Sequence, residues 1–392
     1  MTPQSLMILW SNYLPQTIIS LFYLFQGIQL GFYFFVLPSY LVHKSSEVDI
    51  STLMVAVNLP WSLKIFLSPL VDRYFSRKTW ILTNQLLIVL LFSSLSLINF
   101  DDRTLLALTA LASLLFATQD IAQDAYSIEC HGGHLRTISG TMEVFKKLGT
   151  IVGAIGCGFM LHHFNLAACF LLLALFYLVA FTFNSFSLSS YQHTKATIAY
   201  LLRAPFTALK DKENFKVLIT SVFLILPTGF IHVVFTQHCL TTMSWDKWEF
   251  ISRVGLWAPL GGLVGGLTAI ILVKFYQRQG VLSTSALIQV PLLLSLMIFD
   301  IDGKASIVSL FVFCYQLTNA LLLASIVGII FEQSTPIARA TTITTFISWI
   351  NLCFLGGTFL AAYTIQLTFV QNLSLTLCMI IAGVIYWLSN GN

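Results

Sequence analysis

Long apolar runs without charged residues recur along the whole chain, and no other feature restricts its fold as strongly. A bilayer core about 30 Å thick is crossed by a helix of about 20 apolar residues, so each such run is a candidate membrane span. Only 9% of the 392 residues are charged and 57% are hydrophobic, whereas a soluble domain is about one quarter charged. The sequence therefore predicts an all-α polytopic membrane protein of about twelve spans, near residues 16–38, 51–71, 79–99, 104–127, 138–161, 166–187, 216–240, 250–273, 281–299, 305–331, 340–363 and 368–389.

The lysines and arginines of the loops fall mainly on one side of the predicted membrane. With the even-numbered loops on one side, that side holds 12 of them and the other side holds five. Cytoplasmic loops carry an excess of these residues, so we expect both termini in the cytoplasm. The net charge of +4 reflects this asymmetry and does not call for a nucleic-acid partner. Because the first sixteen residues carry no charge, we expect no cleaved signal peptide.

A polar stretch divides the spans into two sets of six. We interpret residues 188–214 as a cytoplasmic linker between an N-terminal six-helix bundle, 1–187, and a C-terminal six-helix bundle, 215–392. A constant offset of 203 residues supports a duplication, because it relates Gly153 to Gly356 and a Glu–Arg pair after span four to one after span ten. Parallel repeats of six spans are a known plan of transporters.

Two spans contain residues that loosen a helix near mid-membrane. These residues are Gln26, Gly27, Gln29 and Gly31 in span one, and Pro227, Thr228, Gly229 and His232 in span seven. Lipid cannot satisfy the backbone groups that a broken helix frees, so such breaks usually face protein or a wet cavity. We therefore expect broken helices beside a cavity. The alternative is that the glycines let neighbouring helices pack closely.

Six charged residues fall inside predicted spans at a similar depth, namely Lys64, Asp120, Asp124, Glu143, Lys146 and Lys147. A lone charge at the helix centre costs about 2.5–3.5 kcal/mol, so these charges must be paired, hydrated or neutralised. One interpretation is a set of buried salt bridges that holds spans two, four and five together. The other is a proton relay, because Asp120 and Asp124 share one helical face and repel when both are ionised. We expect one of these two aspartates to exchange a proton, with Lys64 as the nearest cationic partner.

Uncharged polar side chains predict where a solute would bind. We expect a central cavity lined by spans one, four, seven and ten, with the side chains of Gln26, Gln29, Gln119, His232, Gln316 and Asn319 exposed to it. For the polar residues of span ten, hydrogen bonding between helices is an equally valid interpretation.

Four stretches of the first 160 residues resemble a known family. They are YLFQGIQLGF from Tyr23, LPWSLKIFLSPLVDRYFSRKTW from Leu59, ATQDIAQDAY from Ala117 and FKKLGTIVGAIG from Phe145. They are similar to the AmpG-like branch of the major facilitator superfamily. The resemblance implies the fold of that superfamily and transport of a solute across a bacterial inner membrane. The branch includes muropeptide permeases, siderophore permeases and eukaryotic acetyl-CoA carriers. The family as a whole favours a muropeptide, while LPW before Lys64 and QG in span one resemble the siderophore permeases at least as well.

The resemblance also assigns a gating role to the turn after span two. In the superfamily this turn helps to gate the inner face, and the matching residues here are Asp72, Arg73, Arg77 and Lys78. The sequence departs from the family pattern at two places. Ser68-Pro69-Leu70-Val71 replaces a glycine-rich start, and Ser76 stands where glycine is usual.

Rival functional classes fit the sequence less well. Rings of like charge or a carbonyl filter, which a channel needs, are not visible, and the GxxxxGK[ST] motif of an ATP-driven pump does not occur. An intramembrane enzyme is the alternative of a different class, with Asp120 and Asp124 as a catalytic pair, or Cys130 with a nearby histidine as nucleophile and base. The same segment, Cys130–His134, offers three metal ligands, but its two glycines fit a flexible loop equally well.

We therefore predict a proton-coupled transporter rather than an enzyme, with no cofactor and no metal. Its expected partners are a small-molecule solute, protons and the lipid bilayer, and we expect it to be a monomer.

Overall fold

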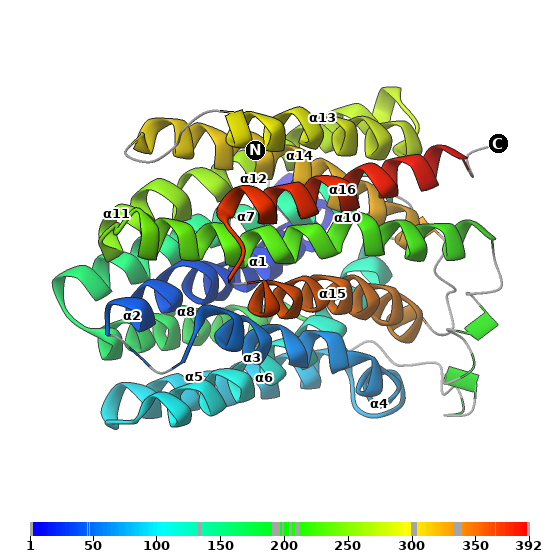
Figure 1. Cartoon of the computed structure of the whole chain (residues 1–392). Helices are drawn as coiled ribbons and strands as arrows, with labels where there is room; N and C mark the ends of the chain where they lie inside the picture. The colour runs from blue at the N-terminus through cyan, green and yellow to red at the C-terminus, as the bar shows by residue number, and fades with distance from the viewer. Residues whose placement is uncertain are drawn as a thin grey trace.

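The computed structural model describes residues 3–389 except 45, 47, 132–134, 190–196, 198–199, 202, 204–205, 208–211, 299–303, 333–338 and 365. Every regular element within these residues is helical, and Figure 1 shows that the axes of the long helices are roughly aligned. In chain order the elements are α1 (Pro3–Gly31), η1 (Phe32–Val36), α2 (Leu37–His43), α3 (Ile50–Leu63), η2 (Lys64–Phe66), α4 (Ser68–Arg73), α5 (Arg77–Leu97), α6 (Asp102–His131), α7 (Leu135–His163), α8 (Leu166–Ser187), α10 (Lys212–Gln237), η3 (His238–Thr242), α11 (Lys247–Phe250), η4 (Ile251–Gly255), α12 (Trp257–Phe275), α13 (Arg278–Ile298), α14 (Ala305–Glu332), α15 (Arg339–Tyr363) and α16 (Phe369–Ser389).

The predicted spans correspond to these helices, and span two is the irregular one. Within the described residues, 11 helical segments are long and apolar enough to cross a membrane, while the segment Ile50–Phe66 is shorter. The 3-10 turn η2 interrupts span two between α3 and α4. Pro69 stands in the first turn of α4, a position where proline is favoured because it needs no helical hydrogen bond there. Span two therefore consists of two helices joined at Lys64.

The predicted breaks in spans one and seven are wrong. Helix α1 is continuous through Gly31, and α10 runs through Pro227 as far as Gln237. Both spans do become irregular, but only afterwards, in the π-helical turns η1 and η3. The glycines of α1 instead serve close packing, which was the alternative interpretation.

The packing of α1 against α7 explains why glycine is needed there. A Cβ atom added to Gly27 would lie 1.9 Å from the carbonyl oxygen of Lys146, and one added to Gly149 would lie 1.9 Å from that of Leu24. The two backbones thus approach closely enough to exclude any side chain, as in the small-residue interfaces of membrane helices. We call this contact, formed by Gly27, Gly31, Gly149 and Gly153, the glycine interface.

Helices from the two ends of the chain meet along two contacts. Helix α7 packs on α12, and α3 packs on α15. In Figure 1, α15 lies beside α3, and α7 lies near α12 and α14. These contacts enclose the centre of the molecule between the segments before and after the predicted linker. Most of that linker lies outside the described residues, so the domain boundaries at 187 and 215 stay predictions.

Candidate functional site

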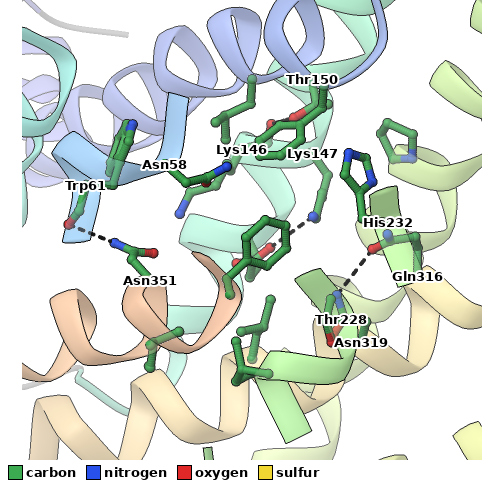
Figure 2. A pocket seen from close by; sticks show the side chains of 18 of the residues that line it. Asn58, Trp61, Lys146, Lys147, Thr150, Thr228, His232, Gln316, Asn319 and Asn351 are labelled. Carbon is green, nitrogen blue, oxygen red and sulfur yellow. Dashed lines mark hydrogen bonds and ion pairs between the residues drawn. The ribbon is translucent and has the colours of Figure 1, made fainter. Parts of the chain in front are cut away.

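A cavity of about 260 Å³ lies at the centre of the molecule (Figure 2). Side chains from α1, η1, α3 and α7 line one part of it, and side chains from α10, α12, α14 and α15 line the rest. The cavity is mixed in chemistry, since amides, two lysines and a carboxylate share it with aromatic rings. Such a surface suits an organic solute that carries both polar and apolar groups.

Four of the six predicted cavity residues line the cavity, namely Gln26, His232, Gln316 and Asn319. Gln29 and Gln119 do not, and this part of the prediction must be corrected. Both are buried, with exposed fractions of 1% and 2%. Span four, as α6, contributes no side chain to the lining within the described residues, because it packs behind α1 and α3. Spans two, five and eleven take its place, with residues such as Asn58, Glu143 and Asn351.

Two buried aspartates lie behind α1, each with its own partners. Asp120 accepts hydrogen bonds from the ammonium of Lys64 and from the amide of Gln26. Asp124 accepts a hydrogen bond of 2.7 Å from the hydroxyl of Tyr23. The exposed fractions of Lys64, Asp120 and Asp124 are 0%, 4% and 3%, so these charges are shielded from water. The predicted pairing of Lys64 with an aspartate on span four is present in the structure, and the aspartate is Asp120.

The remaining three predicted charges lie on the cavity wall formed by α7. Lys147 lies 3.9 Å from Glu143, one helical turn away. The ammonium of Lys146 lies 5.6 Å from the ring centre of Tyr23, within the range of a cation–π interaction. The six charges predicted as one layer thus form two groups, one behind α1 and one on the cavity wall. Tyr23 touches both groups, since its hydroxyl binds Asp124 and its ring faces Lys146.

The opposite wall of the cavity presents uncharged polar groups. The hydroxyl of Thr228 donates to Asn319 at 3.4 Å, and Asn319 donates to Gln316 at the same distance. Asn351 of α15 donates to the backbone oxygen of Trp61 in α3 at 3.3 Å, so it joins the two parts of the cavity wall (Figure 2). The ring of Trp61 lies 5.3 Å from the ammonium of Lys64. This tryptophan therefore contacts both the cavity and the buried charge.

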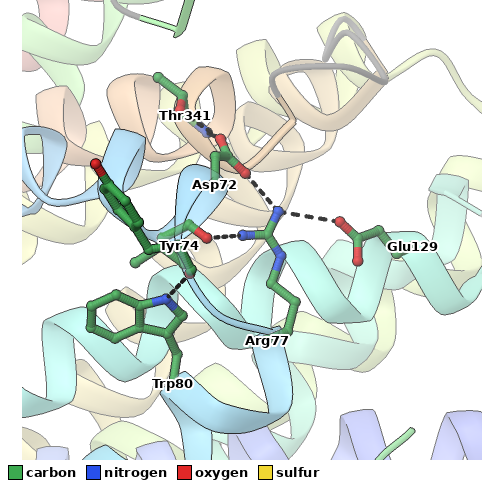
Figure 3. Close-up of polar contacts among 7 residues, drawn as sticks. Asp72, Tyr74, Arg77, Trp80, Glu129 and Thr341 are labelled. Atoms are coloured by element: carbon green, nitrogen blue, oxygen red, sulfur yellow. Dashed lines mark hydrogen bonds and ion pairs between the residues drawn. The ribbon is translucent and has the colours of Figure 1, made fainter. Parts of the chain in front are cut away.

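A second polar cluster lies at the end of the bundle where α4 turns into α5 (Figure 3). The carboxylate of Asp72 accepts from Arg77 at 2.6 Å, and Arg77 also contacts Glu129 at 3.3 Å. The other oxygen of Asp72 accepts from the backbone amide and the hydroxyl of Thr341, at 2.8 and 2.6 Å. Thr341 is in the first turn of α15, where unpaired amides favour an anion. We call these four residues the Asp72 cluster; it ties α4 to α15.

The other two residues of the predicted gating turn lie apart from this cluster. Lys78 donates to the backbone oxygens of Ser185 and Leu188, both at 2.9 Å, which fixes α5 against the end of α8. Arg73 is exposed. The turn itself contains Phe75 with φ of 58°, a conformation in which a non-glycine residue is uncommon. Trp80 supports it by donating to the backbone oxygen of Tyr74 at 2.7 Å.

Several residues that contact the cavity or its charges were not identified from the sequence, among them Tyr23, Asn58, Trp61 and Asn351. A signal for Tyr23 was present, because it lies three residues before Gln26 and hence on the same face of α1. Of the three possible metal ligands Cys130, His131 and His134, His134 lies outside the described part of the chain.

Comparison with known proteins gives the following matches. The family model described as Major Facilitator Superfamily matches residues 19–362. A Haemophilus influenzae protein described as uncharacterized is 33% identical over 146 residues, which are 33% of this chain and 34% of that protein. Proteins named "Putative transporter AmpG 4" from Rickettsia felis and Rickettsia conorii are 26% and 24% identical over 280 residues, or 66% of this chain and 67% of theirs. The chain thus spans about a third of the first relative and about two thirds of the other two.

Proposed function

Because this chain belongs to the major facilitator superfamily, we propose that it is a secondary active transporter that takes up a polar solute together with protons. The observation that carries the proposal is the combination of a central cavity and a buried acid–base pair. The cavity lies between the two sets of helices, and Lys64 with Asp120 lies directly behind its Gln26 wall. We further propose that the membrane is the bacterial inner membrane and that both termini are cytoplasmic, as the distribution of loop lysines and arginines favours.

Our first candidate for the solute is a muropeptide. The Rickettsia relatives named as AmpG transporters support it, as do the amides that line the cavity, because sugars and peptides are bound through such groups. A siderophore is the second candidate, because the LPW sequence before Lys64 is similar to that of the siderophore permeases and its tryptophan, Trp61, lines the cavity. Uptake of each labelled solute into proteoliposomes, with the other as unlabelled competitor, distinguishes the two.

The proposed coupling uses the partners of the two aspartates. In a dry site an ionised carboxylate is stable only while a cation or several donors face it. Asp120 has the cation Lys64 and the amide of Gln26, whereas Asp124 has the hydroxyl of Tyr23. If α1 moves during transport, Gln26 and Tyr23 move with it, and both carboxylates change partners together. An aspartate that loses its donors in a dry site is stable only with a proton bound, which would couple the movement of α1 to proton uptake.

Replacing the aspartates by asparagine tests this coupling. Asp120→Asn and Asp124→Asn keep the shape of the side chain and remove its titration, so accumulation driven by a proton gradient should be lost. Exchange of labelled for unlabelled solute at equal concentrations needs no proton step and should persist. A carrier would release the solute unchanged, whereas an intramembrane enzyme would alter it, and chromatography of the vesicle contents separates these cases.

A purely structural role of the same charges gives a different result. In that case Asp120→Asn would be poorly folded, because removing one partner of a buried ion pair costs about 3–5 kcal/mol, and Asp124→Asn would be destabilised through its hydrogen bond with Tyr23. Adding Lys64→Met to Asp120→Asn would then restore both folding and uptake. If both single variants still accumulate solute in a protonophore-sensitive way, the aspartates are not the coupling site.

A further inference from the structure

Three polar groups of α7 and α10 face the cavity, and none makes a hydrogen bond to another residue in the described part of the chain. The ammonium of Lys147 is 3.9 Å from Glu143, which is too long for a hydrogen bond. The buried Oε2 of Glu143 and the buried Nε2 of His232 have no hydrogen-bond partner among the described residues. Buried polar groups are nearly always satisfied, so the two unsatisfied atoms, beside a lysine whose side chain is 20% exposed and whose ammonium has no close acceptor in the residues described, indicate that a ligand completes them.

Neighbouring apolar groups pack against the side chains of Lys147 and His232 but offer them no hydrogen bonds. The side chain of Lys147 crosses α12 at Gly262, where an added Cβ would lie 2.7 Å from the lysine Cε. The ring of His232 packs beside the rings of Phe34 and Phe354, with centroids 5.0 and 6.3 Å away. Figure 2 shows the side chains of both Lys147 and His232 at this cavity, the first from α7 and the second from α10. The lysine comes from one half of the molecule and the histidine from the other.

The charges on the cavity wall favour a ligand group with a negative charge. Lys146 and Lys147 outnumber Glu143 among the lining residues, so the wall has a formal charge of +1. A ligand with one negative charge neutralises this wall, whereas a cation would add to the imbalance. Glu143 has an exposed fraction of only 8%, and it is the carboxylate that approaches Lys147 here. It occupies the place that a carboxylate of the ligand would take.

We propose that Lys147 and His232 form the subsite for a carboxylate of the transported solute, and that the solute displaces Glu143 from Lys147 when it binds. The inference rests on the proposed transport function, which it extends by naming the solute class as an organic carboxylate. The solute bridges the two halves through this group, with Lys147 on one side and His232 on the other. Glu143 acts as an internal competitor that keeps Lys147 paired while the cavity holds no solute.

Binding to the purified protein in detergent tests the proposal without requiring transport. The probes are N-acetylmuramic acid and N-acetyl-D-alanine, each measured beside its own carboxamide by calorimetry and by thermal unfolding. Both acids should bind at least about tenfold more tightly than their amides, because a buried charge pair is lost in the amide. Lys147→Gln should abolish this preference, and Lys147→Arg should retain it. Glu143→Gln should strengthen binding of the acids but not of the amides.

A matched pair elsewhere in the chain provides the control. Glu249 and Arg253 have the same spacing and the same 3.9 Å separation, but their side chains are 39% and 41% exposed and do not line the cavity. Glu249→Gln should therefore leave the preference for acids unchanged. The proposal is overturned if the acids bind no better than the amides, if Lys147→Gln keeps the preference, or if Glu143→Gln only lowers the unfolding temperature. Failure of proton-driven uptake with the acid preference intact would instead contradict the proposed coupling.

Discussion

The glycine interface between α1 and α7 leads to a prediction whose test and control are two glycines of the same helix, α7. A Cβ atom at Gly153 would lie 1.9 Å from the backbone oxygen of Ile28 in α1. At Gly156, three residues further along α7, an added Cβ would meet only the end of the Leu172 side chain, at 3.5 Å. Alanine should therefore be harmful at position 153 and tolerated at position 156.

The size of the effect follows from the geometry. Moving from 1.9 Å to an ordinary contact of 3.4 Å requires a displacement of α1 by about 1.5 Å, because a backbone oxygen cannot rotate away. Overpacking costs about 1–3 kcal/mol, and the rigid obstacle places Gly153→Ala at the upper end. Alanine is favoured over glycine in a helix by about 1 kcal/mol, which offsets part of this cost. We expect a net destabilisation of about 2 kcal/mol for Gly153→Ala and a stabilisation of up to about 1 kcal/mol for Gly156→Ala.

Unfolding in detergent and uptake into proteoliposomes measure the two consequences. Gly153→Ala should unfold at a lower temperature than the wild type, and Gly156→Ala at the same or a higher one. A shift of α1 by about 1.5 Å would also break the 2.7 Å hydrogen bond between Tyr23 and Asp124, so proton-driven uptake should fall more than stability alone explains. Equal stability and equal uptake for the two variants would refute the close approach of α1 and α7.

Two further predictions concern the ends of the molecule. Asp72→Asn removes the ion pair with Arg77 and weakens the acceptor for Thr341, so the backbone amides at the start of α15 should exchange hydrogen faster. Asp101 caps its own helix through the amide of Thr104, so Asp101→Asn should leave the exchange in α15 unchanged. An equal change in both variants would contradict the role of the Asp72 cluster. A reporter that is active only in the cytoplasm should be active after residue 392 and inactive between Lys44 and Asp49, and the reverse pattern would overturn the proposed orientation.

The positions of the spans could be predicted because each depends on local composition. An apolar run fixes a helix and its approximate ends without reference to the rest of the chain. Span two was the difficult case. Pro69 is a local signal for the helix end that precedes it, but the pairing of Lys64 with Asp120, 56 residues away, leaves no trace in the hydropathy of the span.

The error at Gly27 and Gly31 has the same origin. A glycine within a span is compatible with a broken helix and with a close helix contact, and only the position of α7 decides between them. The assignment of span four to the cavity wall failed for a related reason. The polar face of α6 was identified correctly, but α1 lies between it and the cavity, so its aspartates bind Gln26 and Tyr23 instead of facing the solute.

The sequence identifies the charged residues inside the spans as one set, but it does not show which of them pair with one another. The sequence predicts that buried acids and bases at one depth must neutralise one another. It does not show which of the neighbouring residues Lys146 and Lys147 faces Tyr23 and which faces Glu143, because that depends on how α7 is rotated against α1 and α12.

The glycine interface also limits how the protein can be redesigned. When two side chains collide in a core, a smaller residue at the partner position can relieve the collision. At Gly27 and Gly153 the obstacle is the backbone of the facing helix, which is the same for every residue type, so no second substitution can compensate. Engineering for a new solute should therefore leave the α1–α7 wall untouched and vary Gln316, Asn319 and Asn351 on the opposite wall.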